Sequence, residues 1–152
     1  MNYHYKLNDP FLGIRFNFTP SQVKVVLGEP DSVEKHYYSE TNKGEYDEIL
    51  YYEKGILRII FSYENFAFSD LSIFTECMFI NEVDIFSLSK REVLAQILKI
   101  SRLSSNEAFI ETVNINEVDC DSYEFKDIGL TLWFEFDSLD EICLFNTDEL
   151  NY

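Results

Sequence analysis

Residues 129–136 read GLTLWFEF. Apolar side chains recur at every second position, which is typical of a strand with one buried face. The apolar set is Leu130, Leu132, Phe134 and Phe136, and the opposite set is Thr131, Trp133 and Glu135. The chain's single tryptophan therefore falls on the face that is predicted to point away from the core.

The first half of the chain contains a similar strand, GILRIIFSY at 55–63, in which Leu57, Ile59 and Phe61 form the apolar set. Each of these strands is followed by another apolar segment, DLSIF at 70–74 and EICLF at 141–145. The connections are short, so the pattern predicts antiparallel strands in series. Further strands are expected at 33–38 and 109–115.

Two helices with well-marked starts precede these strands. In FTPSQVKVVLGEP (18–30), Thr19 is a good N-cap, Gln22 completes a capping box, and Gly28 ends the helix. In LSKREVLAQILKI (88–100), Ser89 and Glu92 form the equivalent box. Both segments have apolar residues at helical spacing, which predicts one buried stripe on each helix.

The order of these segments suggests an internal repeat. It predicts an α+β fold of two tandem units, each a capped helix plus a four-stranded antiparallel sheet. The first unit spans residues 1–80 and the second, more acidic unit spans residues 81–152, within one compact globular body. One helix cannot cover both faces of such a sheet. Each sheet therefore keeps one open face, or the two sheets join edge to edge.

The formal net charge is −16, and its distribution is uneven. Residues 103–152 hold 13 acidic side chains and one basic side chain, Lys126. Such a field repels nucleic acid and anionic membranes and attracts basic proteins. We therefore expect a basic protein partner, no nucleic acid and no membrane, although the acidic residues also fit a surface that only keeps the protein in solution.

The N-terminal residues MNYHYKLNDPF lack the apolar core of a signal peptide, and no run has the length of a membrane span. The cysteines Cys77, Cys120 and Cys143 are odd in number and form no CxxC motif. Free thiols in a reducing compartment account for them most simply. The sequence predicts a cytoplasmic protein.

No segment carries a recognisable catalytic or metal-binding motif. The histidines His4 and His36 have no local nucleophile signature, and LGEP at 27–30 is a helix stop rather than a phosphate-binding loop. Asp119 and Asp121 flank Cys120 but lack the glycine and the final glutamate of a calcium loop. We expect no enzyme activity, no cofactor and no bound metal, and an enzyme of unrecognised type remains an alternative.

The non-core face of 129–136 is the candidate partner-binding surface. An aromatic anchor with a polar rim is the usual composition of an interaction hot spot, and an acidic rim suits a basic partner. The predicted binding residues are Trp133, Glu135, Asp137, Asp140, Glu141, Tyr123, Asp119 and Asp121. The alternative is that Trp133 is buried between the two repeats.

The run FTPSQVKVVLGEPDSV, followed by YDEILYYEKGILRIIFSYENFAFSDLSIF, resembles the unit of beta-lactamase-inhibitor-like proteins and small outer-membrane-assembly lipoproteins. The likeness covers residues 14–74 well and residues 84–145 more loosely, because Ile100, Ser101 and Arg102 replace the LG-x-P ending in the second copy. Tandem copies in an acidic chain also resemble immunity proteins of bacterial polymorphic toxin systems. This resemblance implies a protein-binding inhibitor that neutralises a basic toxin such as a nuclease. An assembly or adaptor protein that uses the same face without inhibition is the alternative.

Overall fold

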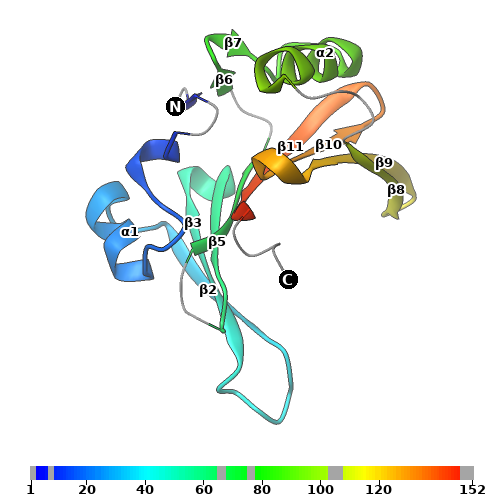
Figure 1. Cartoon of the computed structure of the whole chain (residues 1–152). Helices are drawn as coiled ribbons and strands as arrows, with labels where there is room; N and C mark the ends of the chain where they lie inside the picture. The colour runs from blue at the N-terminus through cyan, green and yellow to red at the C-terminus, as the bar shows by residue number, and fades with distance from the viewer. Residues whose placement is uncertain (1–2, 7–8, 65–67, 75–77, 103–107, 148–152) are drawn as a thin grey trace.

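The computed structural model describes residues 3–6, 9–64, 68–74, 78–102 and 108–147, and it is mostly β-structure (Figure 1). The larger sheet has eight antiparallel strands in the order β2-β3-β4-β5-β11-β10-β9-β8. Its strands are β2 (Ser32–Tyr37), β3 (Tyr46–Tyr52), β4 (Leu57–Phe61), β5 (Phe68–Phe74), β8 (Phe109–Ile115), β9 (Val118–Phe125), β10 (Leu130–Glu135) and β11 (Ser138–Phe145). The strands expected at 33–38 and 109–115 are thus confirmed as β2 and β8.

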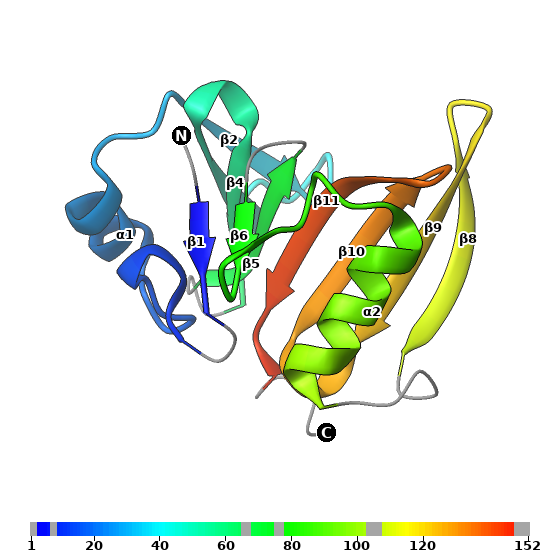
Figure 2. The ribbon, with the colours of Figure 1, turned by 90° about the horizontal axis from the view of Figure 1, so that it is seen from above.

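A second sheet has three short strands, β1 (Tyr3–Tyr5), β6 (Met78–Ile80) and β7 (Val83–Asp84), in the order β1-β6-β7. The α-helices are α1 (Pro20–Leu27) and α2 (Lys90–Ser101). Short 3-10 turns are η1 (Phe11–Gly13), η2 (Glu53–Gly55) and η4 (Lys126–Ile128). Figure 2 shows α1, β1, β6 and α2 on the same side of the larger sheet.

The predicted α+β fold of two helix-plus-four-strand units is wrong. The central strands β5 and β11 pair with each other, with Leu71 opposite Leu144 and Ile73 opposite Ile142, so there is one continuous eight-stranded sheet. Two separate sheets would each leave an apolar strand with unpaired backbone groups at an edge, and this pairing removes both edges. The three-stranded sheet is a further element that the sequence analysis did not predict.

Both helices begin as their sequences predict. Thr19 and Gln22 form the capping box of α1, and Ser89 and Glu92 form that of α2, with side-chain and backbone bonds in both directions. These bonds satisfy backbone N–H groups that the first turn of a helix leaves unpaired. The capping predictions are therefore confirmed.

The alternating apolar residues of β4 and β10 are buried, and they join residues of both helices in one core cluster. This cluster includes Val23 of α1, Val93 and Ile97 of α2, and the strand residues Leu57, Ile59, Phe61, Leu130, Leu132 and Phe134. Phe136 was predicted to belong to the same apolar set, and that is wrong. Its φ is 55° in the turn between β10 and β11, and its side chain is 76% exposed. The chain reverses direction before Phe136 can reach the core.

Gly129 fixes the start of β10 against the end of β11. Its φ is 63°, a conformation that residues with a Cβ rarely adopt. A Cβ at this position would lie 2.3 Å from the backbone oxygen of Phe145. The amide of Phe145 in turn donates to the carbonyl oxygen of Gly129 at 2.9 Å. This close approach sets the position of the β10–β11 hairpin, which carries Trp133.

Candidate binding face

Within the described residues, neither helix nor the small sheet covers one face of the eight-stranded sheet, and we call it the open face (Figures 1 and 2). The ladders of β10 place Trp133 on this face, opposite Glu141 of β11 and Ser122 of β9. The Trp133 side chain is half-buried rather than enclosed. The indole is thus partly accessible at the surface of the sheet.

The open face is concave. Ile115 of β8 lines the same groove as Arg58 and Ile60 of β4, although β5, β11, β10 and β9 lie between those strands in the sheet. Side chains from strands that are so far apart in the sheet can line one groove only if the sheet is strongly curved. Such curvature agrees with the right-handed twist of β-structure. In Figure 1 the strands β2–β5 and the strands β8–β11 form two limbs of an arch, with α2 and the small sheet on its outer side.

Two grooves lie on either side of Trp133. The first, which we call the aromatic groove, has a volume of about 400 Å³, and its lining includes Trp133, Phe109, Phe145, Asp70, Glu111 and Glu124. The second, which we call the seam groove, has a volume of about 440 Å³, and its lining includes Trp133, Arg58, Ser72, Asp140, Glu141 and Cys143. Asp70, Trp133 and Cys143 line both grooves, so the two are parts of one hollow.

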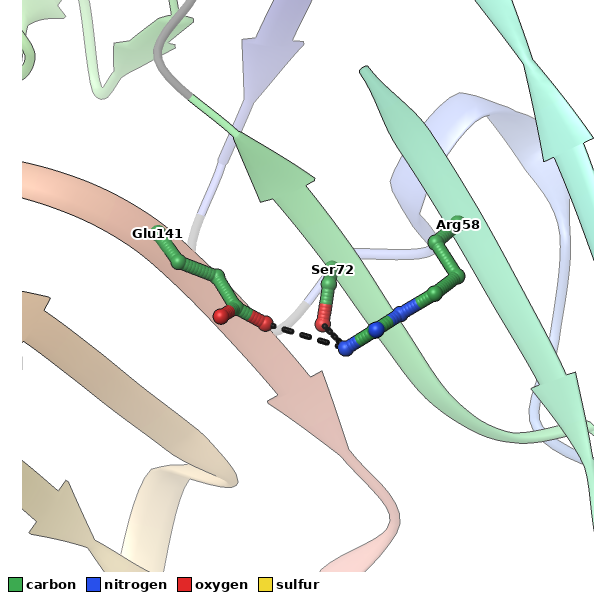
Figure 3. A network of polar contacts seen from close by, with 3 residues as sticks. All are labelled: Arg58, Ser72 and Glu141. Carbon is green, nitrogen blue, oxygen red and sulfur yellow. Dashed lines mark hydrogen bonds and ion pairs between the residues drawn. The ribbon is translucent and has the colours of Figure 1, made fainter. Parts of the chain in front are cut away.

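Arg58 crosses the junction between the two halves of the sheet (Figure 3). Its Nη2 donates to Oγ of Ser72 in β5 and to Oε1 of Glu141 in β11, both at 3.3 Å. Its guanidinium carbon lies 5.0 Å from the ring centre of Phe74. The Nε atom is buried and has no hydrogen-bond partner among the described residues. One guanidinium on this face is therefore already held by a carboxylate and an aromatic ring.

Two titratable groups at the centre of the hollow have raised pKa values. Burial is the main cause for the carboxyl of Asp70, and the nearby Asp47 adds to it, whereas the hydrogen bond from Ser69 opposes it. Burial also raises the pKa of the Cys143 thiol to about 12, with a contribution from the charge of Asp70. The centre of the hollow therefore disfavours the charged forms of Asp70 and Cys143, although many carboxylates surround it.

Carboxylates dominate the charged groups of the open face. On the described strands of this face Arg58 is the one cationic side chain. The carboxylates that the register or the groove linings place there are Glu34, Asp47, Asp70, Glu111, Glu124, Glu135, Asp140 and Glu141. A cation that approaches this face meets an attractive potential, and an anion meets a repulsive one.

The structure brings together four of the predicted binding residues. Trp133, Asp140 and Glu141 line the seam groove. Glu135 pairs with Cys120 at the end of β10, and burial and then the charge of Glu135 raise the pKa of that thiol. These four residues remain candidates for partner binding, because they share one surface.

The other four predicted residues do not share that surface, and the placement of Tyr123 beside Trp133 is wrong. Tyr123 pairs with Leu132, a core residue, so its ring lies on the helix side and packs edge-on against Phe134. Alternation within β9 does not set its register against β10, and a shift of one residue exchanges the two faces.

Asp121, Asp119 and Asp137 have local partners instead. Asp121 accepts from Lys90 of α2 and from Thr112, and both bonds lower the pKa of its carboxyl. Asp119 accepts from Asn114. Asp137 lies in the β10–β11 turn, where its backbone oxygen accepts from the amide of Lys90. These contacts tie β8 to β9, and α2 both to β9 and to the β10–β11 turn.

Sequence reasoning missed the contributions of Phe109, Glu111, Asp70 and Arg58 to the hollow. The alternation within 55–63 does place Arg58 opposite the apolar core positions. In 109–115 both alternating sets mix apolar and polar residues, so the pattern does not assign Phe109 and Glu111 to a face. The sequence, however, contains no signal for the pairing of β5 with β11 or for the curvature that brings β8 over the centre of the sheet.

Among the described residues, no group of three or more His, Cys, Asp or Glu side chains is arranged to hold a metal ion. Cys120 and Cys143 are free thiols, and Cys77 lies outside the described residues. No helix in the described part of the chain is both long enough and apolar enough to span a membrane.

The chain was compared with models of known protein families, with curated proteins and with solved structures, and none of the three comparisons gave a match.

Proposed function

We propose that this chain is a non-enzymatic protein-binding inhibitor whose open face covers a basic partner in the cytoplasm. In its specific form, the proposal is that the chain is an immunity protein that neutralises a basic toxin such as a nuclease. The observation that carries the binding part is the concave open face, where a half-buried tryptophan lies among carboxylates. The toxin part rests on the sequence resemblance.

Concavity and charge support a face that receives a convex, cationic surface. Acidic groups around a binding site accelerate encounter with a basic protein and exclude acidic competitors. A tryptophan with one accessible side supplies the large apolar contact that hot spots require. Both features are present around Trp133, and Asp140 and Glu141 lie beside it in the seam groove.

Inhibition follows from the same charges. The active site of a nuclease must attract polyanionic phosphate, so it is positively charged. A face rich in carboxylates competes with the nucleic acid for that site and blocks it sterically. No catalytic group on the inhibitor is required for this mechanism.

The test is capture of the partner from the native host, followed by a toxicity assay. The captured basic protein should stop growth when it is expressed alone and should be harmless when it is co-expressed with the wild-type chain. Protection should be lost with Trp133→Ala or Glu141→Lys on the open face. It should persist with Glu82→Lys, because Glu82 is an exposed residue between β6 and β7 in the small sheet.

Other outcomes would change the proposal. A captured protein that binds through Trp133 but is harmless by itself would show an adaptor rather than an immunity protein. Equal loss of protection with Glu82→Lys and Glu141→Lys would show that net charge, and not the open face, decides binding. Binding of nucleic acid by the chain itself would contradict the electrostatic argument.

A further inference from the structure

The aromatic groove combines aromatic rings with carboxylates in a manner that suits one kind of ligand group. Trp133, Phe109 and Phe145 come from β10, β8 and β11, so three rings converge from different strands. The carboxylates of Asp70, Glu111 and Glu124 line the same groove. Ring faces attract cations through the negative potential of the π-system, and desolvation strengthens this attraction.

The rim of this groove already holds a cation of the chain. Nζ of Lys126 lies 5.9 Å from the ring centre of Phe109 and 3.7 Å from Oε1 of Glu124. The Lys126 side chain is 60% exposed, so it occupies the outer edge and leaves the interior accessible. Phe109 and Glu124 thus already hold one cation at the rim. The interior of the groove combines the same two kinds of side chain, an aromatic ring and a carboxylate.

In the neighbouring seam groove, a guanidinium group is already held by an aromatic ring and a carboxylate. Arg58 lies over the ring of Phe74 and donates to Glu141. A flat guanidinium fits such a site because it stacks on a ring while its N–H groups point outward to carboxylates. Ammonium groups are compact and more strongly hydrated, so they gain less from stacking.

The buried carboxyl of Asp70 also favours a cation in the interior of the aromatic groove. Its carboxyl is largely buried, and Ser69 is the donor that the structure gives it. Burial raises its pKa, and the opposing effects of the Ser69 hydrogen bond and of the Arg58 charge do not cancel this rise. A cation in the aromatic groove would offset this desolvation cost, as opposite charges within a few ångströms do.

We propose that the aromatic groove receives an arginine side chain of the basic partner, stacked on Trp133 and paired with Glu111 and Glu124. The groove volume of about 400 Å³ is within the range of small-ligand sites. The inference rests on the proposed function, and it names the group of the partner that the face recognises. A partner side chain fits better than free arginine, whose α-carboxylate would be repelled by the surrounding acidic residues.

The experiment uses the full chain and the capped peptide acetyl-Gly-Arg-Gly-amide. Trp133 is the only tryptophan and lines both grooves, so its emission reports on binding anywhere in the hollow, and the variants below locate the ligand. We expect a saturable change in emission. The affinity should fall at least about tenfold when citrulline, a neutral analogue of the same shape, replaces arginine. The lysine peptide and free arginine should both bind more weakly than the arginine peptide.

Matched variants separate the groove from general attraction. Glu111→Gln combined with Glu124→Gln should lower the affinity at least about tenfold, as should Phe109→Ala, whose ring is 58% exposed and therefore dispensable for the core. Glu82→Gln combined with Glu117→Gln removes the same charge from exposed turns and should change the affinity less than twofold.

Three results would overturn the inference. They are the absence of a saturable change in emission, equal affinity for the arginine and citrulline peptides, and an equal effect of the two double variants. The proposed function would survive any of them if the captured basic protein still bound wild type and not Trp133→Ala. A loss of partner binding to wild type would instead refute the function itself.

Discussion

Arg58 and Glu141 are 83 residues apart in the sequence, and their side chains meet at 3.3 Å across the middle of the sheet. Arg58 reaches over β5 to do so, with Ser72 as a second acceptor on the way. The side chains are 30% and 17% exposed, respectively, so water screens the pair only in part. The contact therefore reports directly on whether the two halves of the sheet are joined.

A double-mutant cycle with Arg58→Met and Glu141→Gln should give a coupling energy of about 1 kcal/mol, between that of an exposed ion pair and that of a buried charged hydrogen bond. The measurement is the free energy of unfolding from urea titration of the four proteins. Additive effects of the two changes would mean that the pair does not stabilise the junction.

Asp70→Asn should stabilise the protein at pH 7. The folded-state pKa of Asp70 is raised, so the folded chain releases this proton at a higher pH than the unfolded chain. The free energy of unfolding therefore falls as the pH rises from the pKa of Asp70 in the unfolded chain through its pKa in the folded chain. It stays lower at every higher pH. Asparagine removes that cost and can still accept from Ser69.

The gain from Asp70→Asn should shrink as the pH falls and should vanish below about pH 4, the ordinary pKa of an aspartate, where both side chains are neutral. Urea titrations at three pH values from 7 downward check this dependence. A gain that is constant with pH would show that the carboxylate charge is not its cause.

Cys143 should resist alkylation in the folded protein. With a pKa of about 12, its thiol is far less ionised at pH 8 than an ordinary thiol, and the thiolate is the reactive form. Iodoacetamide at pH 8 should modify it on the order of 10³-fold more slowly in the folded chain than in the denatured chain. Peptide mass mapping over time measures both rates, and similar rates would contradict the buried, anionic surroundings described for Cys143.

Trp133→Ala should cost at least about 2 kcal/mol of partner binding, as expected for a hot spot. The melting temperature should fall only slightly, because the indole lies on the open face and the core of β10 is made by Leu130, Leu132 and Phe134. Calorimetric titration with the captured partner gives the affinity. Tyr123→Phe is the matched control on the opposite face and should leave the affinity unchanged.

The sequence predicted those parts of the fold that depend on local patterns. Capping boxes at Thr19 and Ser89 located both helix starts, because their bonds join residues three positions apart. Alternation located β4 and β10 and placed Trp133 on the correct face, because the side-chain period of a strand is two. These signals require no knowledge of which strands are neighbours.

The relations between distant segments were not predictable in this way. Tyr123 was assigned to the wrong face because alternation within one strand does not fix its register with the next. Asp121 became a partner of Lys90 because α2 packs over β9 and β10, and spacing in the sequence does not reveal this contact. The aromatic groove exists because curvature brings Phe109 toward Asp70, and curvature is a property of the whole sheet.

The central pairing of β5 with β11 has a consequence for biosynthesis. Phe74 of β5 pairs with Glu141 of β11, which follows 67 residues later, so at about 5–20 residues per second the ribosome needs on the order of 3–13 s to synthesise the chain between them. During this interval β5 presents an apolar edge that has no neighbour. An unpaired edge of this kind makes a nascent chain prone to non-native pairing, and a stop codon before β11 would remove an inner strand rather than a dispensable tail.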